Sequence, residues 1–147
     1  MDERLEAYFV KKYPNLFKDY GKDTKEANMR KGCTCGEGWF RILNRAFREI
    51  EREGVHLSQV TEKYGNLEIS WYYSSKELSL HTSKEIQDLC YSAERESAHR
   101  CEVCGRGGGK KGMVCFQTLC SRCNSLSIED LQQERDKCIK YIFEDLY

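Results

Sequence analysis

The chain has 147 residues, which is enough for one domain built around one hydrophobic core. Its 24 lysine and arginine residues balance its 24 aspartate and glutamate residues, so bulk charge does not favour attachment to nucleic acid or to a membrane surface. The first residues are charged and lack the apolar run of a signal peptide, and no segment is apolar enough to cross a bilayer, so we expect a cytoplasmic protein.

Two helices are predicted in the first third of the chain. Residues 3–13 place Leu5 and Phe9 at helical spacing, and Pro14 ends the pattern. A polar stretch follows at 15–36, with a turn of helix near 23–30 and a tight turn at 33–38. Residues 39–52 then form the clearest amphipathic helix, with Gly54 suited to end it. Its apolar face consists of Trp39, Ile42, Leu43, Ala46, Phe47 and Ile50.

A β-hairpin is predicted for residues 55–73. Apolar and polar residues alternate over 67–73, which is typical of a half-buried strand, and Gly65-Asn66 suits a two-residue turn. Residues 75–81 are expected to add a short third strand. A helix capped by Thr82 or Ser83 then runs to about Ala98. Helices around a small antiparallel sheet define an α+β fold class.

A long final helix is predicted over 125–146. Its buried side is expected to comprise Ile128, Leu131, Cys138, Ile139, Ile142, Phe143 and Leu146. These residues form two apolar rows, which serve either inward packing or a homodimer contact. We therefore treat residues 1–147 as a single compact domain whose oligomeric state the sequence does not define.

Four of the nine cysteines have the spacing of a zinc site. Cys101 and Cys104 form one C-x-x-C pair, and fifteen residues later Cys120 and Cys123 form another. A gap of two residues allows both sulfurs of a pair to reach one ion, and zinc favours four thiolates in a tetrahedron. We predict one structural Zn²⁺ ion, with four unrelated buried cysteines as the alternative. All four ligands are thiolates, so the site is closed and activates no water.

The sequence around these cysteines predicts a treble-clef-like module at 99–147. A knuckle at Cys104-Gly105 would be followed by a glycine-rich hairpin with a strand at 113–119, and the second pair would lie at the entrance of the last helix. Basic residues gather here, namely Arg100, Arg106, Lys110, Lys111 and Arg122. They either offset the charge of a zinc tetrathiolate or contact nucleic-acid phosphates, and both interpretations stay open.

The other cysteines suggest weaker hypotheses. Cys33 and Cys35 could build a second metal site with Cys90, Cys115 or Cys138, although buried cysteines commonly serve as small apolar residues. Cys35 is also a candidate reactive thiol, because a helix begins nearby. His99 is a candidate hydrogen-bond partner of the zinc ligands. The chain contains no catalytic triad, P-loop or paired nuclease histidines, so we expect no enzyme activity.

The predicted hairpin is rich in aromatic residues: Tyr64, Trp71, Tyr72 and Tyr73. One face should pack on the helices, and Tyr72 should point outward. The outward aromatics either form a second layer of core beneath the N-terminal segment or an exposed binding surface.

The motifs resemble a family of small zinc-binding proteins of tailed bacteriophages. The resemblance covers residues 13–124 and is carried by Cys35-Gly-Glu-Gly-Trp39, Gln59-Val-Thr-Glu-Lys-Tyr-Gly-Asn-Leu67, Ala93-Glu94 with Ser97, Cys101-Glu-Val-Cys104-Gly105 and Thr118-Leu-Cys120. Family members have histidine as the last ligand in some cases, where this chain has Cys123. The resemblance implies a phage origin and the cytoplasm of an infected bacterium, and it implies no activity.

Three functions are compatible with these observations. The first is a protein that binds and inhibits or modulates a bacterial host or defence component. The second is a nucleic-acid-binding zinc module that uses the basic loop around Lys110 and Lys111. The third is a protein that sequesters a nucleotide signal in a pocket lined by tyrosine and arginine.

Overall fold

The computed structural model describes residues 1–74, 80–112 and 117–147. Its elements in chain order are α1 (Glu3–Lys12), β1 (Cys33–Thr34), the 3-10 helix η1 (Glu37–Trp39), α2 (Phe40–Ile50), the 3-10 helix η2 (Glu51–Glu53), β2 (His56–Lys63), β3 (Asn66–Tyr72), α3 (Leu80–Ser97), β4 (Lys110–Lys111), β5 (Thr118–Leu119), α4 (Ser121–Asn124) and α5 (Ile128–Leu146). Helices and small sheets are mixed, which confirms the predicted α+β class.

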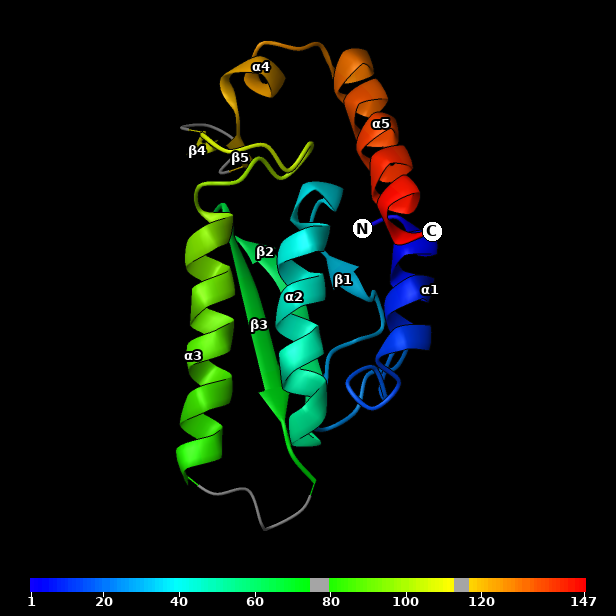
Figure 1. Cartoon of the computed structure of the whole chain (residues 1–147), viewed down its shortest axis with the longest axis vertical. Helices are drawn as coiled ribbons and strands as arrows, with labels where there is room; N and C mark the ends of the chain where they lie inside the picture. Colours follow the sequence, from blue (N-terminus) through cyan, green and yellow to red (C-terminus); the bar gives the residue numbers. More distant parts are fainter. Residues whose placement is uncertain (75–79, 113–116) are drawn as a thin grey trace.

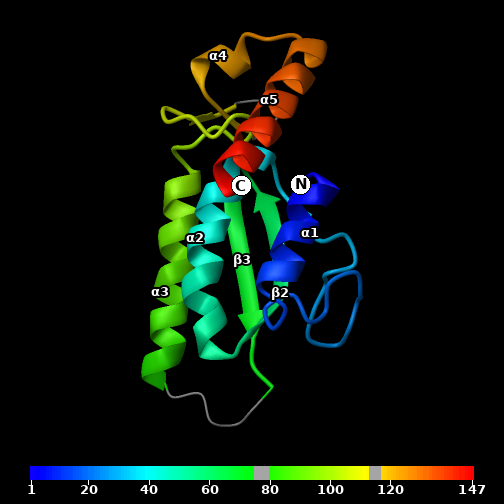
Figure 2. The same ribbon diagram turned by 45° about the vertical axis from the view of Figure 1, so that its right-hand side comes forward.

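The main sheet has three strands in the order β1-β2-β3. β2 and β3 form the predicted antiparallel hairpin, whereas β1 pairs in parallel with β2 at a position where the sequence predicted only a tight turn. In Figures 1 and 2, α2 and α3 lie side by side over one face of this sheet. The small β4–β5 hairpin lies at one end of the sheet, and α5 runs back from there until its C-terminus meets α1.

The core between α1 and α2 is aromatic. The ring of Phe9 stacks on Phe40 with centroids 4.5 Å apart and meets the edge of Phe47 at 5.1 Å. All three side chains are buried, and every residue of the predicted apolar face of α2 is buried with them. Such close ring contacts add to the free energy of area burial, so α1 is firmly held against α2.

The opposite face of the sheet is partly covered by residues 13–32. The Tyr72 hydroxyl donates to the carboxylate of Asp19, and the His56 ring packs against Tyr72 at 5.3 Å. Tyr72 therefore belongs to the second core layer that the sequence left as one alternative. The helical turn expected near 23–30 is absent from this described segment, where Asp23 and Asn28 instead form an antiparallel bridge.

The turn of the main hairpin lies one residue earlier than predicted. It consists of Tyr64 and Gly65, whose φ angles are 53° and 83°, and Lys63 pairs with Asn66. A turn that matches the right-handed twist of a hairpin requires positive φ at both central positions. Asn66 pairs in β3 instead, because this register places Leu67 and Ile69 on the buried face.

Several other predicted boundaries change. Thr82 and Ser83 do not cap α3, because the helix already begins at Leu80, and residues 75–79 of the expected third strand lie outside the described residues. Residues 113–116 of the expected strand 113–119 also lie outside them. Ile128 is 87% exposed, since Ser127 caps α5 at this point and the buried residues begin further along the helix.

The outer edge of β3 is closed by side chains of α3. The backbone N–H of Leu67 donates to Ser97 Oγ at 2.9 Å, and that of Ile69 donates to Glu94 Oε1 at 3.3 Å. An open strand edge exposes such donors to other chains, so these bonds protect the edge. Glu94 and Ser97 thus have a structural role.

Candidate metal centre and surrounding surfaces

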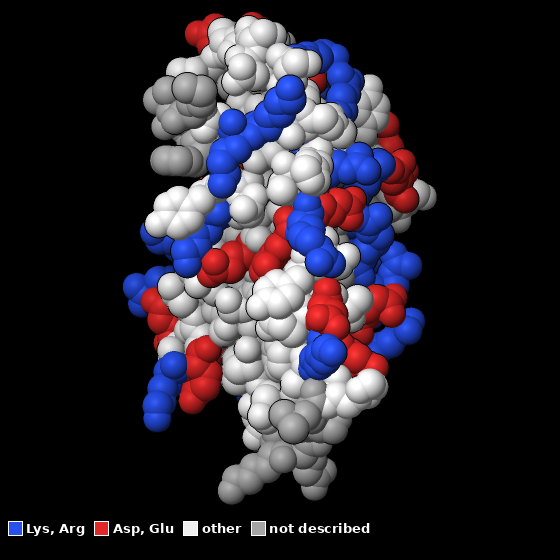
Figure 3. Space-filling model, turned by 90° about the vertical axis from the view of Figure 1, so that its left-hand side faces the viewer, with Lys and Arg blue, Asp and Glu red and all other residues white. Residues whose placement is uncertain are grey.

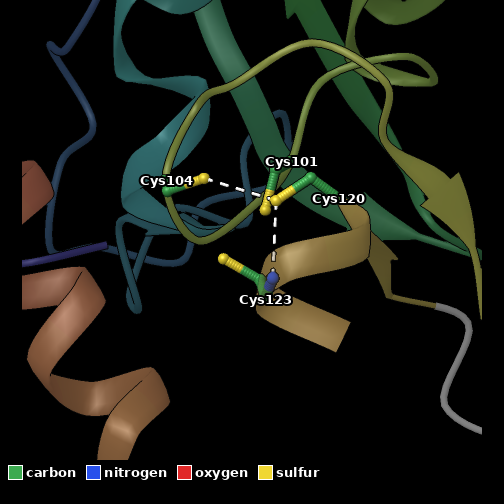
Figure 4. A group of neighbouring side chains, drawn as sticks. All are labelled: Cys101, Cys104, Cys120 and Cys123. Carbon is green, nitrogen blue, oxygen red and sulfur yellow. Dashed lines mark hydrogen bonds between the residues drawn. The ribbon is translucent and has the colours of Figure 1, made fainter. Parts of the chain in front are cut away.

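Cys101, Cys104, Cys120 and Cys123 converge as their spacing predicted. Their ligand atoms all lie within 4.8 Å of one another, and the sulfurs of Cys104 and Cys120 are 3.7 Å apart. Figure 4 shows that the side chains come from two segments, a loop after α3 and the start of α4. The cluster could hold a metal ion, and among residues 1–74, 80–112 and 117–147 it is the only group of three or more potential ligands found.

Backbone hydrogen bonds shape both segments around the cluster. The Cys101 carbonyl accepts from the Gly105 N–H at 2.9 Å, and the Cys101 N–H donates to the Arg106 carbonyl. Gly105 has a φ of 72°, which closes this tight loop without side-chain strain. On the second segment, the Cys123 N–H points at the sulfur of Cys120 at 3.5 Å. The sulfurs are therefore oriented by the main chain.

The thiols differ in their tendency to ionise. Burial, together with the charge of Cys101, raises the pKa of Cys104 to about 11 and moves the pKa of Cys123 well above its usual value. For Cys120, burial acts in the same direction but is outweighed by hydrogen bonds from the Cys123 N–H and the neighbouring thiols, so its pKa is lowered. Cys120 therefore ionises more readily than Cys104 and Cys123, and the ionised form is the one that binds a metal.

The segment from Cys35 to Trp39 packs against the loop that carries Cys101 and Cys104. The Gly38 N–H donates to the Glu102 carbonyl at 2.8 Å, and Trp39 Nε1 donates to the Arg100 carbonyl at 2.9 Å. Gly36 adds a bond from its N–H to Glu102 Oε1 at 3.0 Å. A Cβ atom at Gly38 would clash with the Cys101 carbonyl and lie 2.6 Å from the Gly105 nitrogen. Both glycines are thus required for this close approach, which we call the glycine joint.

The second cysteine pair lies on a separate helix, which corrects the predicted position at the entrance of the last helix. Cys120 caps the four-residue α4 and Cys123 lies within it, while α5 begins only at Ile128. Glu134 on α5 accepts hydrogen bonds from Arg122 at 2.8 Å and from Lys137 at 3.0 Å. This buried carboxylate links α4 to α5.

The remaining described cysteines form no second cluster. Cys33, Cys35 and Cys90 are buried, and Cys138 is half-buried. Burial raises the pKa of Cys35, which argues against the hypothesis of a reactive thiol. Cys115 lies outside the described residues. His99 is exposed and supports the loop through its carbonyl, which accepts from the Gly109 N–H at 3.0 Å.

Of the basic residues near the cysteines, Arg122 pairs with Glu134, and the others occupy two places. Lys110 and Lys111 are exposed on β4, whereas Arg106 lines a groove between α2 and α5. The principal basic residues of that groove are Arg41, Arg45 and Arg48 on the polar face of α2, which the sequence did not single out. Their spacing along one helix face was visible in the sequence, but the elements opposite them were not.

The aromatic residues of the hairpin do not form one continuous surface. Tyr64, at 66% exposed, lies at the hairpin turn, while Trp71 and Tyr73 lie at the other end of β3 with ring centroids 6.3 Å apart. Tyr91 of α3 and Trp71 line a shallow hollow together. Nothing in the sequence singled out Tyr91, because it lies outside the apolar stripe of its helix. Figure 3 looks onto the side formed by α3, where acidic and basic side chains are interspersed.

Comparison with known proteins gives no relative for this chain. No protein-family model matches the sequence, and no curated protein or solved structure is significantly similar to it. Among the described residues, no helix is both long enough and apolar enough to pass through a membrane.

Proposed function

We propose that the protein is a zinc-stabilised, non-enzymatic accessory protein of phage origin that binds and inhibits or modulates a host or defence protein in the bacterial cytoplasm. The observation that carries this proposal is the aromatic patch formed by Trp71, Tyr73 and Tyr91. Tyr73 and Tyr91 are 46% and 52% exposed on the side of the molecule formed by α3 and β3. The resemblance to phage proteins supports the cellular context.

The cysteine cluster fits Zn²⁺. With Zn–S bonds of about 2.3 Å, the sulfurs of a tetrahedral site lie about 3.8 Å apart. The distance of 3.7 Å between Cys104 and Cys120 matches this edge. Four thiolates leave no open position, so the ion would hold structure. The order of knuckle, β4–β5 hairpin and α4 supports a treble-clef-like module, although α4 is shorter than the expected helix.

Metal analysis tests the zinc site. The purified chain should contain one zinc ion, and Cys104→Ser should lose the ion and unfold at a lower temperature, because metal binding at such sites contributes folding free energy. Cys138→Ala is a matched control, since this cysteine is half-buried on α5 and outside the cluster. A metal-free wild-type chain of undiminished stability would refute the zinc site.

The aromatic patch has the composition of a protein-binding surface. Tyrosine and tryptophan bring large apolar area at a low cost in side-chain entropy, and they dominate the energetics of protein interfaces. Glu68, Gln87 and Glu94 line the same hollow and supply a polar rim. The Glu94 side chain also fixes β3, so the patch lies on a rigid support.

Co-purification from bacteria tests the partner. The tagged chain should recover a stoichiometric host protein, and Tyr73→Ala with Tyr91→Ala should abolish recovery while leaving the melting temperature unchanged. Tyr64→Asn is the control, because asparagine tolerates the positive φ of this exposed turn. Loss of the partner with Tyr64→Asn alone would move the contact to the hairpin turn, and no recovered partner would contradict the proposal.

A further inference from the structure

A groove lined by arginine lies away from the aromatic patch. It has a volume of about 710 Å³ and runs between α2, α5 and the loop of Cys101 and Cys104. Figure 1 shows these three segments around one region of the molecule. Five arginines line the groove, from two separate segments of the chain: Arg41, Arg45 and Arg48 of α2, and Arg100 and Arg106 of the loop.

The arginines are available to a ligand. Arg41 pairs with Asp145, and Arg45 pairs with Glu96, yet the two arginine side chains remain 66% and 60% exposed. Glu96 also holds Arg100 at 3.6 Å. Exposed ion pairs of this kind contribute little to stability, so an incoming anion can replace the carboxylates at low cost. No ion pair is found for Arg48 or Arg106 within the described part of the chain.

The spacing of the arginines suits several phosphates in a row. Arg41, Arg45 and Arg48 follow one face of α2 over seven residues, which corresponds to about 10 Å of helix. A strand within a duplex carries one phosphate per about 3.4 Å of helix axis, and a single strand can be more extended, so this row matches about two to three consecutive phosphates. Arginine also offers a planar fork that binds phosphate through two hydrogen bonds at once.

The opposite wall offers a surface for a base. Tyr141 of α5 is 61% exposed and lines the groove, and the floor beneath includes the buried side chains of Phe40 and Ile142. Exposed aromatic rings beside a basic track are the usual platform on which unpaired bases stack. We propose that this arginine groove binds a short single strand of nucleic acid, with phosphates on α2 and a base on Tyr141.

Fluorescence anisotropy with the full zinc-loaded chain tests the proposal. The probe is a labelled single strand of about ten nucleotides, within the usual range of site sizes. With about two to three phosphates bound, affinity should fall about 7- to 20-fold between about 50 and 200 mM salt. Arg45→Ala with Arg48→Ala should weaken binding at least 10-fold. Glu96→Gln should tighten it severalfold, because it releases Arg45 and Arg100 from their shared carboxylate.

Two sets of controls make the assignment specific. Arg30→Ala removes an exposed arginine paired with Asp23 outside the groove, and it should leave affinity unchanged. Unchanged affinity in the Arg45 and Arg48 variant, or loss of binding with Lys110→Ala and Lys111→Ala, would overturn the proposal. The proposal also fails if free ATP displaces the labelled strand as well as an equal concentration of unlabelled strand nucleotides does. It fails as well if a duplex of the same length binds more tightly than the single strand, or if poly-glutamate displaces the labelled strand as well as an unlabelled strand does. The last result would assign the groove to an acidic protein.

Discussion

At the scale of residues, the candidate metal centre depends on the four cysteines that could bind the ion and on the two glycines that let another segment approach them. The cysteine cluster was predictable, because each C-x-x-C pair is local in sequence and thiolates have few alternatives at that spacing. The glycine joint was not, because Gly36 and Gly38 gain their meaning from Glu102 and Cys101, more than sixty residues away. Their sequence suggested only a turn, since the close approach of two backbones leaves no local pattern.

The glycine joint can be tested by adding a single methyl group. Gly38→Ala should lower stability by about 2–3 kcal/mol, and the melting temperature by about 5–10 °C, because its Cβ would collide with main-chain atoms of the cysteine loop. Thermal unfolding with zinc present measures this. Gly107→Ala is the control, since the nearest atom to its Cβ is 3.9 Å away on the Arg100 side chain. Equal melting temperatures for the two variants would contradict this prediction, because they would show that the two backbones can move apart to accommodate the methyl group.

Acid should release the metal. In the metal-free site the raised pKa values of Cys104 and Cys123 keep these thiols protonated at neutral pH, so metal binding must displace their protons. Affinity therefore rises with pH and falls as the pH is lowered, by about tenfold per pH unit for each proton displaced. A coloured chelator in competition with the protein should report release that steepens from neutral pH towards pH 5. Release that is independent of pH would contradict thiolate ligation.

At the scale of elements, tertiary contacts decided the boundaries that local propensity left open. The sequence located the hairpin, α2 and most of α5 because their apolar periodicity is strong, but it misplaced the hairpin turn by one residue and the start of α5 by three. It missed β1, since a strand of two residues has no periodicity and exists only through its pairing with β2. It also missed the contact between α3 and the edge of β3, in which side chains of a helix complete the hydrogen bonding of a strand.

Removal of the Ser97 hydroxyl group should lower the stability of the protein, because this group accepts a hydrogen bond from the edge of β3. Ser97 is fully buried, and Ser97→Ala would leave the Leu67 N–H buried without an acceptor, at a cost of about 1–3 kcal/mol. Thermal unfolding and hydrogen exchange at the Leu67 amide measure the effect. Ser92→Ala changes an exposed position of the same helix and should be neutral within about 0.5 kcal/mol. If both variants were neutral, the edge would be held by packing alone.

At the scale of the whole molecule, the buried apolar residues that the structure describes form two clusters of very different size. The larger cluster joins α1, α2, α3, the sheet and the end of α5. The smaller cluster consists of Cys101, Val103, Cys120 and Cys123, with Leu119 and Leu131 packed against it. A core of this size cannot hold a fold without a metal or cross-link, so the metal should control one end of the protein and not the other.

Metal removal should therefore unfold the molecule unevenly. After chelation, hydrogen exchange followed by mass spectrometry should quicken in residues 101–112 and 117–131, while 40–50 and 57–72 stay protected, because the aromatic core of α1 and α2 needs no metal. Added zinc should restore protection, and Cys104→Ser should reproduce the chelated pattern. The glycine joint helps to set how far the disorder spreads, since its bonds to Glu102 link the two clusters directly, together with the bond from Thr118 Oγ1 to the Gly65 carbonyl. Uniform exchange throughout the chain would mean that the joint makes both clusters a single cooperative unit.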